Sequence, residues 1–200
     1  TGGAEAALVR RCAAGDEAAC VELVEAHQRM VFHLAVHLLG DQEEALDLSQ
    51  EVFLNVFRTI GRFRGQSALR TWIYRIAVNQ ARNRHRFWRR RHRDAQVSLD
   101  EHLANHGEFA APAESSAPDR ALGRKQLGAQ LMRVLDQLPF EQRSAVILRE
   151  IDGLSYEEIA ASMDCPVGTV RSRIFRAREA IDRRLREVFD GGLGRAEELV

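Results

Sequence analysis

The sequence predicts an all-α protein made of two small helical domains joined by a flexible acidic linker. Three observations support this: apolar residues recur at helical spacing, strand signals are almost absent, and one long segment loses the periodicity. With 200 residues and 45% hydrophobic content, the chain has enough apolar surface for a core in each domain. The predicted organisation is a front domain at 1–95, a linker at 96–119, a back domain at 120–190 and a tail at 191–200.

Glycines and a change of composition divide the chain into these parts. No proline precedes Pro112, and Gly15, Gly40 and the Gly61/Gly65 pair fall between apolar stripes. The stretch before residue 120 is rich in Pro, Ser, Ala and acids, a composition typical of linkers. The predicted helices span residues 4–14, 17–39, 42–60 and 67–90 in front, and 120–137, 139–151, 155–163 and 166–189 behind.

The formal net charge is zero, but the charges are separated into blocks along the chain. Residues 41–51 hold five acids and no base, and residues 58–93 hold twelve arginines and no acid. Residues 94–119 hold six acids and no base, and residues 171–186 hold seven arginines against two acids. Because solvated surfaces usually mix their charges, two separate arginine blocks indicate two contacts with one polyanion.

Several classes of protein and site are not supported by the sequence. No apolar run is long enough for a membrane span or a secretory signal, so a cytoplasmic protein without membrane insertion is expected. Three scattered cysteines argue against a disulfide framework, and each is expected to be a small buried apolar residue. Catalytic motifs are absent, and the His33/His37 and His102/His106 pairs lack a third metal ligand. A non-enzymatic protein without metal, cofactor or small-molecule substrate is therefore expected.

Residues 154–185 predict a helix-turn-helix. Ser155 and Glu158 form an S-x-x-E capping box for a short helix, and Asp164-Cys165-Pro166 turns the chain into the next one. Two helices joined by so short a turn are typical of a DNA-reading unit. An ordinary helical hairpin with a solvated basic face is the alternative, but it gives no role to an exposed Phe175.

The second helix of this unit has a buried stripe and an opposite face suited to base edges. Its apolar residues Val170, Ile174, Ala177, Ile181, Leu185 and Val188 recur every three or four positions. Arginine can bond guanine, and an exposed phenylalanine can pack on a thymine methyl. The expected DNA-reading residues are Thr169, Arg171, Ser172, Arg173, Phe175 and Arg176.

The front domain contains two further candidate surfaces. On the helix at 42–60, Leu54 lies among charged residues away from the apolar stripe, which indicates a partner contact or simply a singly exposed leucine. The following basic segment suits a single-stranded nucleic acid, because arginines can track phosphates while aromatic rings receive bases. Its aromatic residues are Phe63, Trp72, Tyr74, Phe87 and Trp88, of which Trp72 also fits the core stripe.

Residues 152–182, DGLSYEEIAASMDCPVGTVRSRIFRAREAID, resemble the region that reads the minus-35 promoter element in sigma-E-type, extracytoplasmic-function (group IV) sigma factors. The string DLSQEVFLNVFR at 47–58 resembles the sigma region that docks on the polymerase beta-prime clamp helices. The resemblance covers roughly residues 5–95 and 120–189. It implies a four-helix sigma region 2 domain, a helix-turn-helix sigma region 4 domain, and promoter-specific transcription initiation with core RNA polymerase.

The resemblance also implies roles for particular residues. Core docking falls on Asp47, Leu48, Gln50, Glu51, Leu54 and Arg58. Capture of a flipped minus-10 base falls on the loop at 62–67 and on Asn79, with contacts from Phe63, Arg64, Ser67, Asn79, Arg82, Asn83 and Arg86.

Further partners follow from the same family. They are promoter DNA, the polymerase beta flap and an anti-sigma factor, which in a stress response can tether the chain at the inner membrane. A polymerase-independent helix-turn-helix regulator is the alternative, but it leaves residues 47–58 and the twelve-arginine segment unexplained.

Overall fold

The computed structural model of the chain describes residues 2–95, 128 and 130–193. These residues form helices and connecting turns, with no strand among them, as the all-α prediction requires. The front half contains α1 (Gly2–Ala13), α2 (Glu17–Leu39), α3 (Gln42–Thr59), the short 3-10 helix η1 (Ile60–Arg62) and α4 (Leu69–Ala95). The back half contains a helical stretch at 130–136, α6 (Phe140–Glu150), α7 (Tyr156–Met163) and α8 (Val167–Leu193).

Local hydrogen bonds set the boundary between α2 and α3. Gly40 ends α2 in the left-handed conformation, at φ 77°. The side chain of Asp41 then caps α3, because its Oδ1 accepts from the backbone N–H of Glu44 at 2.9 Å. These signals lie within the sequence of the boundary itself, which is why the predicted helices 17–39 and 42–60 agree with α2 and α3 to within one residue.

The start of α4 depends on contacts that are distant in sequence. α4 begins two residues later than the predicted helix 67–90 and ends later as well. Its first backbone N–H, that of Leu69, donates to Glu5 Oε1 of α1 at 3.0 Å. The loop before α4 folds back along the helix, because the Phe63 ring packs on the Trp72 ring with centroids 5.3 Å apart.

The predicted helix-turn-helix is present in the back half. Ser155 Oγ accepts from the N–H of Glu158 at 3.1 Å, and Glu158 Oε2 accepts from the N–H of Ser155 at 2.8 Å, so the capping box is complete. Asp164 ends α7 in the left-handed region, at φ 53°. α8 then starts directly after Pro166 and extends to Leu193, beyond the predicted end at residue 189.

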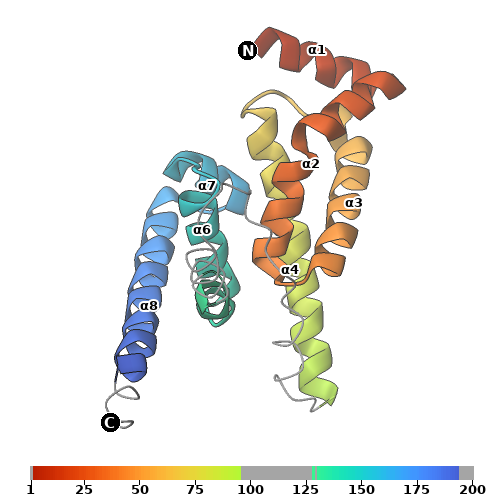
Figure 1. Ribbon diagram of the computed structural model, residues 1–200. Helices are drawn as coiled ribbons and strands as arrows, with labels where there is room; N and C mark the ends of the chain where they lie inside the picture. Colours follow the sequence, from red (N-terminus) through yellow and green to blue (C-terminus); the bar gives the residue numbers. More distant parts are fainter. Residues whose placement is uncertain (1, 96–127, 129, 194–200) are drawn as a thin grey trace, which may run out of the picture.

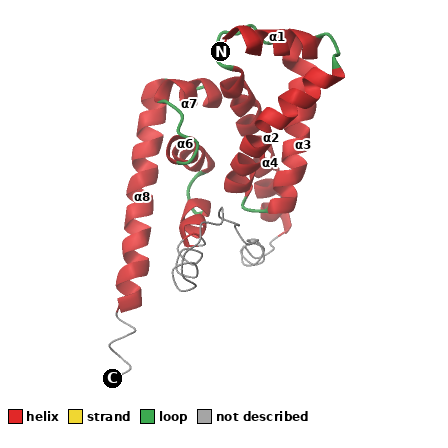
Figure 2. Cartoon of the chain, turned by 45° about the horizontal axis from the view of Figure 1, so that its top comes forward, coloured by secondary structure: helices red, strands yellow, loops and turns green. Residues whose placement is uncertain are grey.

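The two halves of the chain pack against each other. In Figures 1 and 2, α2, α3 and α4 lie side by side with α1 across one end. α6 and α7 lie between α4 and α8, and α8 packs on both of them. Tyr74 of α4 and Ile159 of α7 are fully buried in one continuous apolar cluster. Ser162 Oγ of α7 also donates to the backbone oxygen of Thr71 at 3.4 Å. The halves therefore share part of their core.

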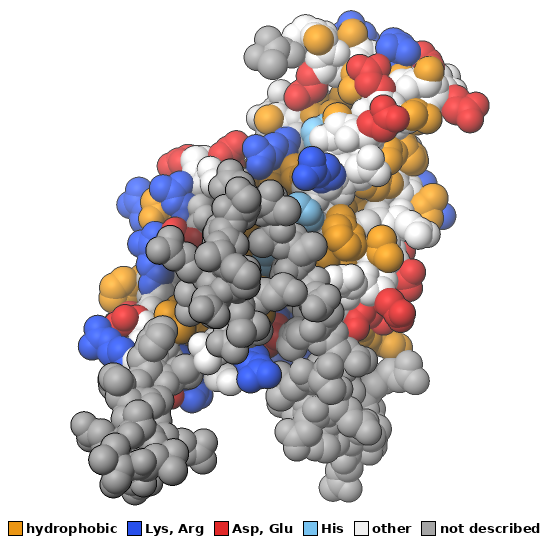
Figure 3. All heavy atoms as spheres, viewed as in Figure 1, with side chains coloured by type: hydrophobic (Ala, Val, Ile, Leu, Met, Phe, Trp, Pro, Cys, Tyr) orange, Lys and Arg blue, Asp and Glu red, His pale blue; other side chains and the backbone are white. Residues whose placement is uncertain are grey.

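The charge blocks of the sequence become separate faces of the molecule. In Figure 3, basic side chains gather along the edge formed by α8, and acidic side chains lie at the opposite edge, over the first turns of α3. Within residues 2–95 and 130–193, no helix is both long enough and apolar enough to span a membrane. The predicted linker at 96–119 lies outside the described residues.

Candidate nucleic-acid interface

The first turns of α8 present an exposed face formed by the predicted minus-35 readers. Val170 and Ile174, 0% and 2% exposed, anchor the opposite side of the helix in the core. Phe175 is 62% exposed, which is unusual for so large an apolar side chain unless it meets a partner. The side chains exposed beside it are those of Arg171, Ser172 and Arg176.

Tyr156, which is not among the predicted site residues, contacts two arginines at this face. The guanidinium carbon of Arg171 lies 5.7 Å from the centroid of the Tyr156 ring, and that of Arg149 lies 4.9 Å from it. Both distances are within the range of a cation–π interaction. Tyr156 starts α7, so its ring connects the first helix of the unit to a reading residue on the second. In the sequence, the signal that could have identified Tyr156 is an aromatic residue directly after the capping serine.

Arg173 differs from its neighbours because it is already paired. Its Nη1 lies 3.2 Å from Glu141 Oε2, and its side chain is only 24% exposed. The same carboxylate accepts from Arg82 Nε at 2.7 Å and from Arg82 Nη2 at 3.1 Å. Glu141, in the first turn of α6, therefore neutralises one arginine from each of the two predicted DNA-contacting sets.

Asn79, the predicted base-capturing residue, lies beside this ion pair. Its Oδ1 accepts from Arg82 Nη1 at 2.7 Å. Asn79 follows Trp72 by seven residues, so both lie on one face of α4 about 10 Å apart. Because Phe63 packs on Trp72, the loop and Asn79 share that face. The remaining predicted minus-10 residues are Arg64 and Ser67 in the loop, and Asn83 and Arg86 further along α4.

One face of α3 carries the predicted polymerase-docking residues, with one exception. Leu54 is 54% exposed, as expected for a partner contact. Leu48 is only 1% exposed and belongs to the core, so its inclusion in the docking surface was wrong. The apolar stripe of α3 packs on α2 and α4 and includes this leucine. The exposed members of the predicted set are Asp47, Gln50, Glu51, Leu54 and Arg58.

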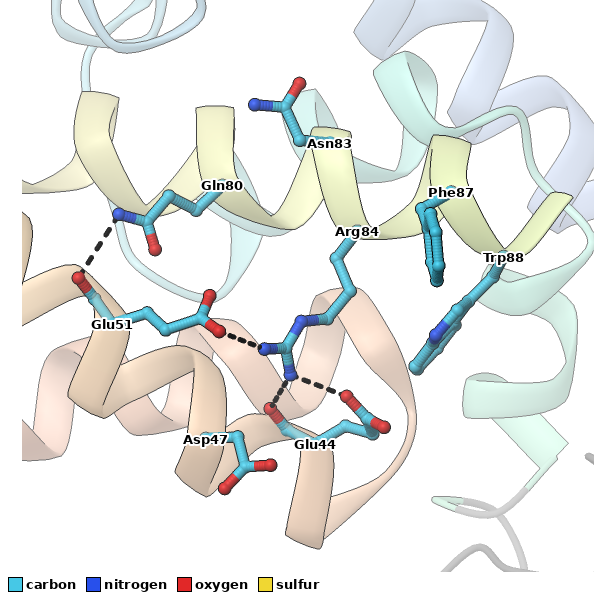
Figure 4. A pocket seen from close by; sticks show the side chains of 8 residues that line it. All are labelled: Glu44, Asp47, Glu51, Gln80, Asn83, Arg84, Phe87 and Trp88. Carbon is cyan, nitrogen blue, oxygen red and sulfur yellow. Dashed lines mark hydrogen bonds and ion pairs between the residues drawn. The ribbon is translucent and has the colours of Figure 1, made fainter. Parts of the chain in front are cut away.

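Arg84 connects this face of α3 to α4. Its Nη1 donates to Glu44 Oε2 at 2.5 Å and its Nη2 to Glu51 Oε1 at 2.7 Å. Figure 4 shows the guanidinium reaching from α4 between the two carboxylates, in a groove that Phe87 and Trp88 line at one end. Arg84 was not among the predicted site residues. Its partners are 33 and 40 positions away, so no local pattern marks it.

The histidine spacing has a local explanation. His37 Nδ1 is 2.7 Å from the backbone oxygen of His33, a contact that the i, i+4 spacing brings about within one helix. Among the described residues, no group of three His, Cys, Asp or Glu side chains could hold a metal ion. His102 and His106 lie outside the described residues.

Comparison with known proteins matches each half of the chain to a protein family. Residues 23–93 match the family described as Sigma-70 region 2, and residues 128–181 match Sigma-70 region 4. The RNA polymerase sigma-H factor of Pseudomonas aeruginosa is 45% identical over 178 residues, 89% of this chain and 92% of that protein. The chain belongs to the ECF family of RNA polymerase sigma factors. The ECF sigma-E factor of Escherichia coli is 44% identical, with the same coverage of both chains.

Solved structures of other proteins share this arrangement of helices. The sigma factor RpoE from Bartonella quintana, solved in complex with the anti-sigma factor NepR, aligns with a TM-score of 0.64 at 25% identity, over 82% of this chain and 95% of that chain. CnrH in complex with the cytosolic domain of CnrY aligns with the same TM-score at 23% identity, over 91% and 97%. The second likeness concerns the fold alone.

Within this sigma factor, Tyr74 is a core residue at the contact between region 2 and region 4. Its ring is fully buried, which excludes it from the aromatic residues that could receive a base. Burial raises the pKa of its hydroxyl to about 12, and Arg70 Nη2 donates to the hydroxyl oxygen at 3.1 Å. The same Arg70 nitrogen donates to the backbone oxygen of Asp152 at 3.2 Å. Burial also raises the pKa of Asp152, to about 6.

Proposed function

We propose that this sigma factor initiates promoter-specific transcription through three surfaces on two domains. Region 4 reads the minus-35 element with α8, region 2 docks on the beta-prime clamp helices with α3, and α4 with its loop captures a minus-10 base. The proposed boundaries are residues 1–95 for region 2, 96–119 for the linker, 120–190 for region 4 and 191–200 for the tail. The observation that carries the proposal is the exposed Phe175, 62% accessible beside the exposed side chains of Arg171, Ser172 and Arg176 on a helix-turn-helix.

Reading of the minus-35 element rests on the chemistry of that face. Arg171 and Arg176 can each bond a guanine edge in the major groove, and Phe175 can pack on a thymine methyl. Thr169 and Ser172 add hydroxyl groups that bond either base edge. Arg173 joins the set only after its bond to Glu141 is exchanged for a phosphate or a base.

Docking on core polymerase rests on the mixed character of the α3 face. Leu54 offers an apolar contact at the centre, and the charged and amide side chains around it give the contact its orientation. Arg84 of α4 forms ion pairs with Glu44 and Glu51, and these pairs hold α3 against α4. Asp47 and Arg58 remain exposed. The same pairing couples the docking face to the helix that carries Asn79.

Capture of the minus-10 base rests on the shared face of the loop and Asn79. The Asn79 amide can bond the freed edge of an extruded base, and the Phe63–Trp72 ring pair lies on the same face of α4. Arg82, Asn83 and Arg86 follow at helical spacing and can hold the strand through its phosphates. Arg64 and Ser67 contact the strand from the loop.

Control by an anti-sigma factor is the proposed regulation. The Bartonella quintana relative was solved with such a partner. We propose that a partner of the same kind covers the α3 face and the reading face of α8 in a stress-responsive system. Tethering of this chain at the cytoplasmic side of the inner membrane would follow if that partner spans the membrane. Constitutive transcription by the native sigma factor in unstressed cells would contradict this regulation.

The proposal is tested by run-off transcription with core polymerase on promoters randomised at both elements. We expect the Phe175→Ala variant to lose selectivity at the minus-35 element alone. Asn79→Ala should lose selectivity at the minus-10 element and form open complexes more slowly, and unchanged values of both would refute base capture. An electrophoretic shift of promoter duplex by the pure protein, without core, would instead favour the polymerase-independent regulator.

A further inference from the structure

Two thiols meet where α1 ends and α2 begins. Cys12 lies in the last turn of α1 and Cys20 in the first turn of α2, and their Sγ atoms are 2.7 Å apart. Cys12 is 5% exposed, whereas Cys20 is partly accessible. The sequence predicts each cysteine to be a small buried apolar residue. Cys12 is such a core residue, whereas Cys20 is only partly buried.

The turn between the helices holds the two sulfur atoms in place. Gly15 adopts a left-handed conformation, at φ 86°, that lets the chain reverse within a few residues. Asp16 then accepts from the N–H of Ala19 at 3.1 Å and from Arg11 Nε at 2.8 Å, so it is bonded to both helices. A disulfide has an S–S length of about 2.05 Å, so the two sulfur atoms are only about 0.7 Å further apart than bonded ones.

We propose that Cys12 and Cys20 are the site of a reversible intramolecular disulfide, formed when a hydroperoxide oxidises this sigma factor. Cys20, the accessible thiol, attacks the O–O bond as its thiolate and becomes a sulfenic acid, and the hydroperoxide leaves as an alcohol, or as water if it is hydrogen peroxide. Cys12 sulfur then displaces hydroxide from Cys20 sulfur, and the Cys12 proton converts this hydroxide to water. Two thiols are oxidised and one peroxide is reduced by two electrons.

The environment of Cys12 indicates that this thiol reacts second, by attacking the oxidised sulfur of Cys20. Burial, together with the adjacent Cys20 and Asp16, raises the pKa of the Cys12 thiol to about 12. A thiol with so high a pKa is protonated at neutral pH and is a poor first nucleophile. Conversion of Cys20 to a sulfenic acid provides an electrophilic sulfur within reach of Cys12.

The disulfide would fasten α1 over the proposed minus-10 loop. α1 packs on η1, which leads directly into that loop, and Val9 of α1 is buried in the core. Glu5 of α1 accepts from the N–H of Leu69, an amide that has no partner within α4 because it lies at the helix start. A bond between α1 and α2 therefore resists undocking of α1 and loss of the Glu5 contact.

The test uses the full chain, reduced, then treated with hydrogen peroxide, denatured and alkylated. We expect mass spectrometry to find a loss of about 2 Da, a Cys12–Cys20 linked peptide and alkylation of Cys165 alone, all reversed by dithiothreitol. Cys165→Ser should keep the disulfide, and Cys12→Ser should abolish it. Alkylation of all three thiols, sulfinic acid at Cys20 without a linked peptide, or a disulfide that includes Cys165 would overturn the proposal.

Hydrogen exchange of the oxidised and reduced proteins tests the structural consequence. We expect the Leu69 amide and the amides of η1 to exchange about threefold more slowly, or slower still, after oxidation. The Cys12→Ser variant should show no change on peroxide treatment. Equal exchange rates in a protein that carries the linked peptide would refute the effect on α1. Both readouts are independent of promoter recognition.

Discussion

Leu48 and Leu54 lie six residues apart on α3 and have opposite environments. Leu48 is 1% exposed in the core, and Leu54 is 54% exposed on the proposed docking face. Both are leucines on one helix, so residue type does not separate them. The position of α2 and α4 against α3 decides which leucine is covered.

Alanine substitutions at these two leucines should have opposite consequences. Leu48→Ala leaves a core cavity and should lower the free energy of unfolding by about 2–5 kcal/mol. Leu54→Ala should change it by less than about 0.5 kcal/mol but weaken binding to core polymerase about tenfold or more. Urea denaturation and competition for core measure the two effects. A stable Leu54→Ala protein with full core affinity would remove Leu54 from the docking surface.

At the scale of single elements, short-range bonds determine where the reading unit begins. The capping box of α7 joins Ser155 and Glu158 through two hydrogen bonds within four residues. α7 has only eight residues, too few to be stable by helix propensity alone. Its cap and its packing against α4 and α8 therefore hold the helix that supports α8.

Ser155→Ala should destabilise region 4 by about 1 kcal/mol, because the N–H of Glu158 loses its acceptor at the helix start. Ser172→Ala is the matched control, since that hydroxyl donates to the backbone oxygen of Thr169 within α8 and caps no helix. Urea denaturation followed by circular dichroism measures both variants. Equal stability of the two proteins would show that the capping box contributes nothing beyond α7 packing.

Across the whole molecule, contacts between region 2 and region 4 occupy residues of both proposed DNA surfaces. Glu141 pairs with Arg82 and Arg173, and Arg82 also holds Asn79. If both proposed surfaces bind promoter DNA, these arginines must exchange a carboxylate for nucleic acid. The packed arrangement of the two regions therefore competes with simultaneous DNA binding by the two proposed surfaces.

Glu141→Gln should weaken the packed arrangement by on the order of 1–2 kcal/mol, because the neutral amide replaces charge-assisted bonds that are partly exposed. We expect a larger radius of gyration by small-angle X-ray scattering. Glu150→Gln is the control, because its partner Arg178 lies in the same region and the pair is about half exposed. An unchanged radius for Glu141→Gln would show that apolar packing alone holds the regions together.

The contact between the regions should also depend on pH. The pKa of Asp152 is raised from 3.8 to about 6, mainly because the carboxyl group is buried. Tyr74 and Arg70 of α4 face this group and lower its pKa by a smaller amount. The packed state therefore binds a proton more tightly than the open state, so its stability is greatest at low pH and falls as pH rises from about 4 to about 6. Over this pH range the packed state loses up to about 3 kcal/mol of stability relative to the open state.

Scattering at pH 5 and pH 8 tests this dependence. The radius of gyration should be smaller at pH 5, and Asp152→Asn should remove most of the difference because the amide does not titrate. A pH dependence that persists in Asp152→Asn would assign it to other groups, such as the partly buried His85 beside Phe140.

The sequence by itself determined the helices, the helix-turn-helix and the exposed face of α8, because periodicity, caps and left-handed turns act within about ten residues. Tertiary structure alone decided that Cys12 meets Cys20 and that Arg84 joins two glutamates of α3. It also decided that one carboxylate, that of Glu141, forms ion pairs with both Arg82 and Arg173. These contacts join side chains from different helices, so they depend on how whole helices pack, and no short sequence pattern encodes that.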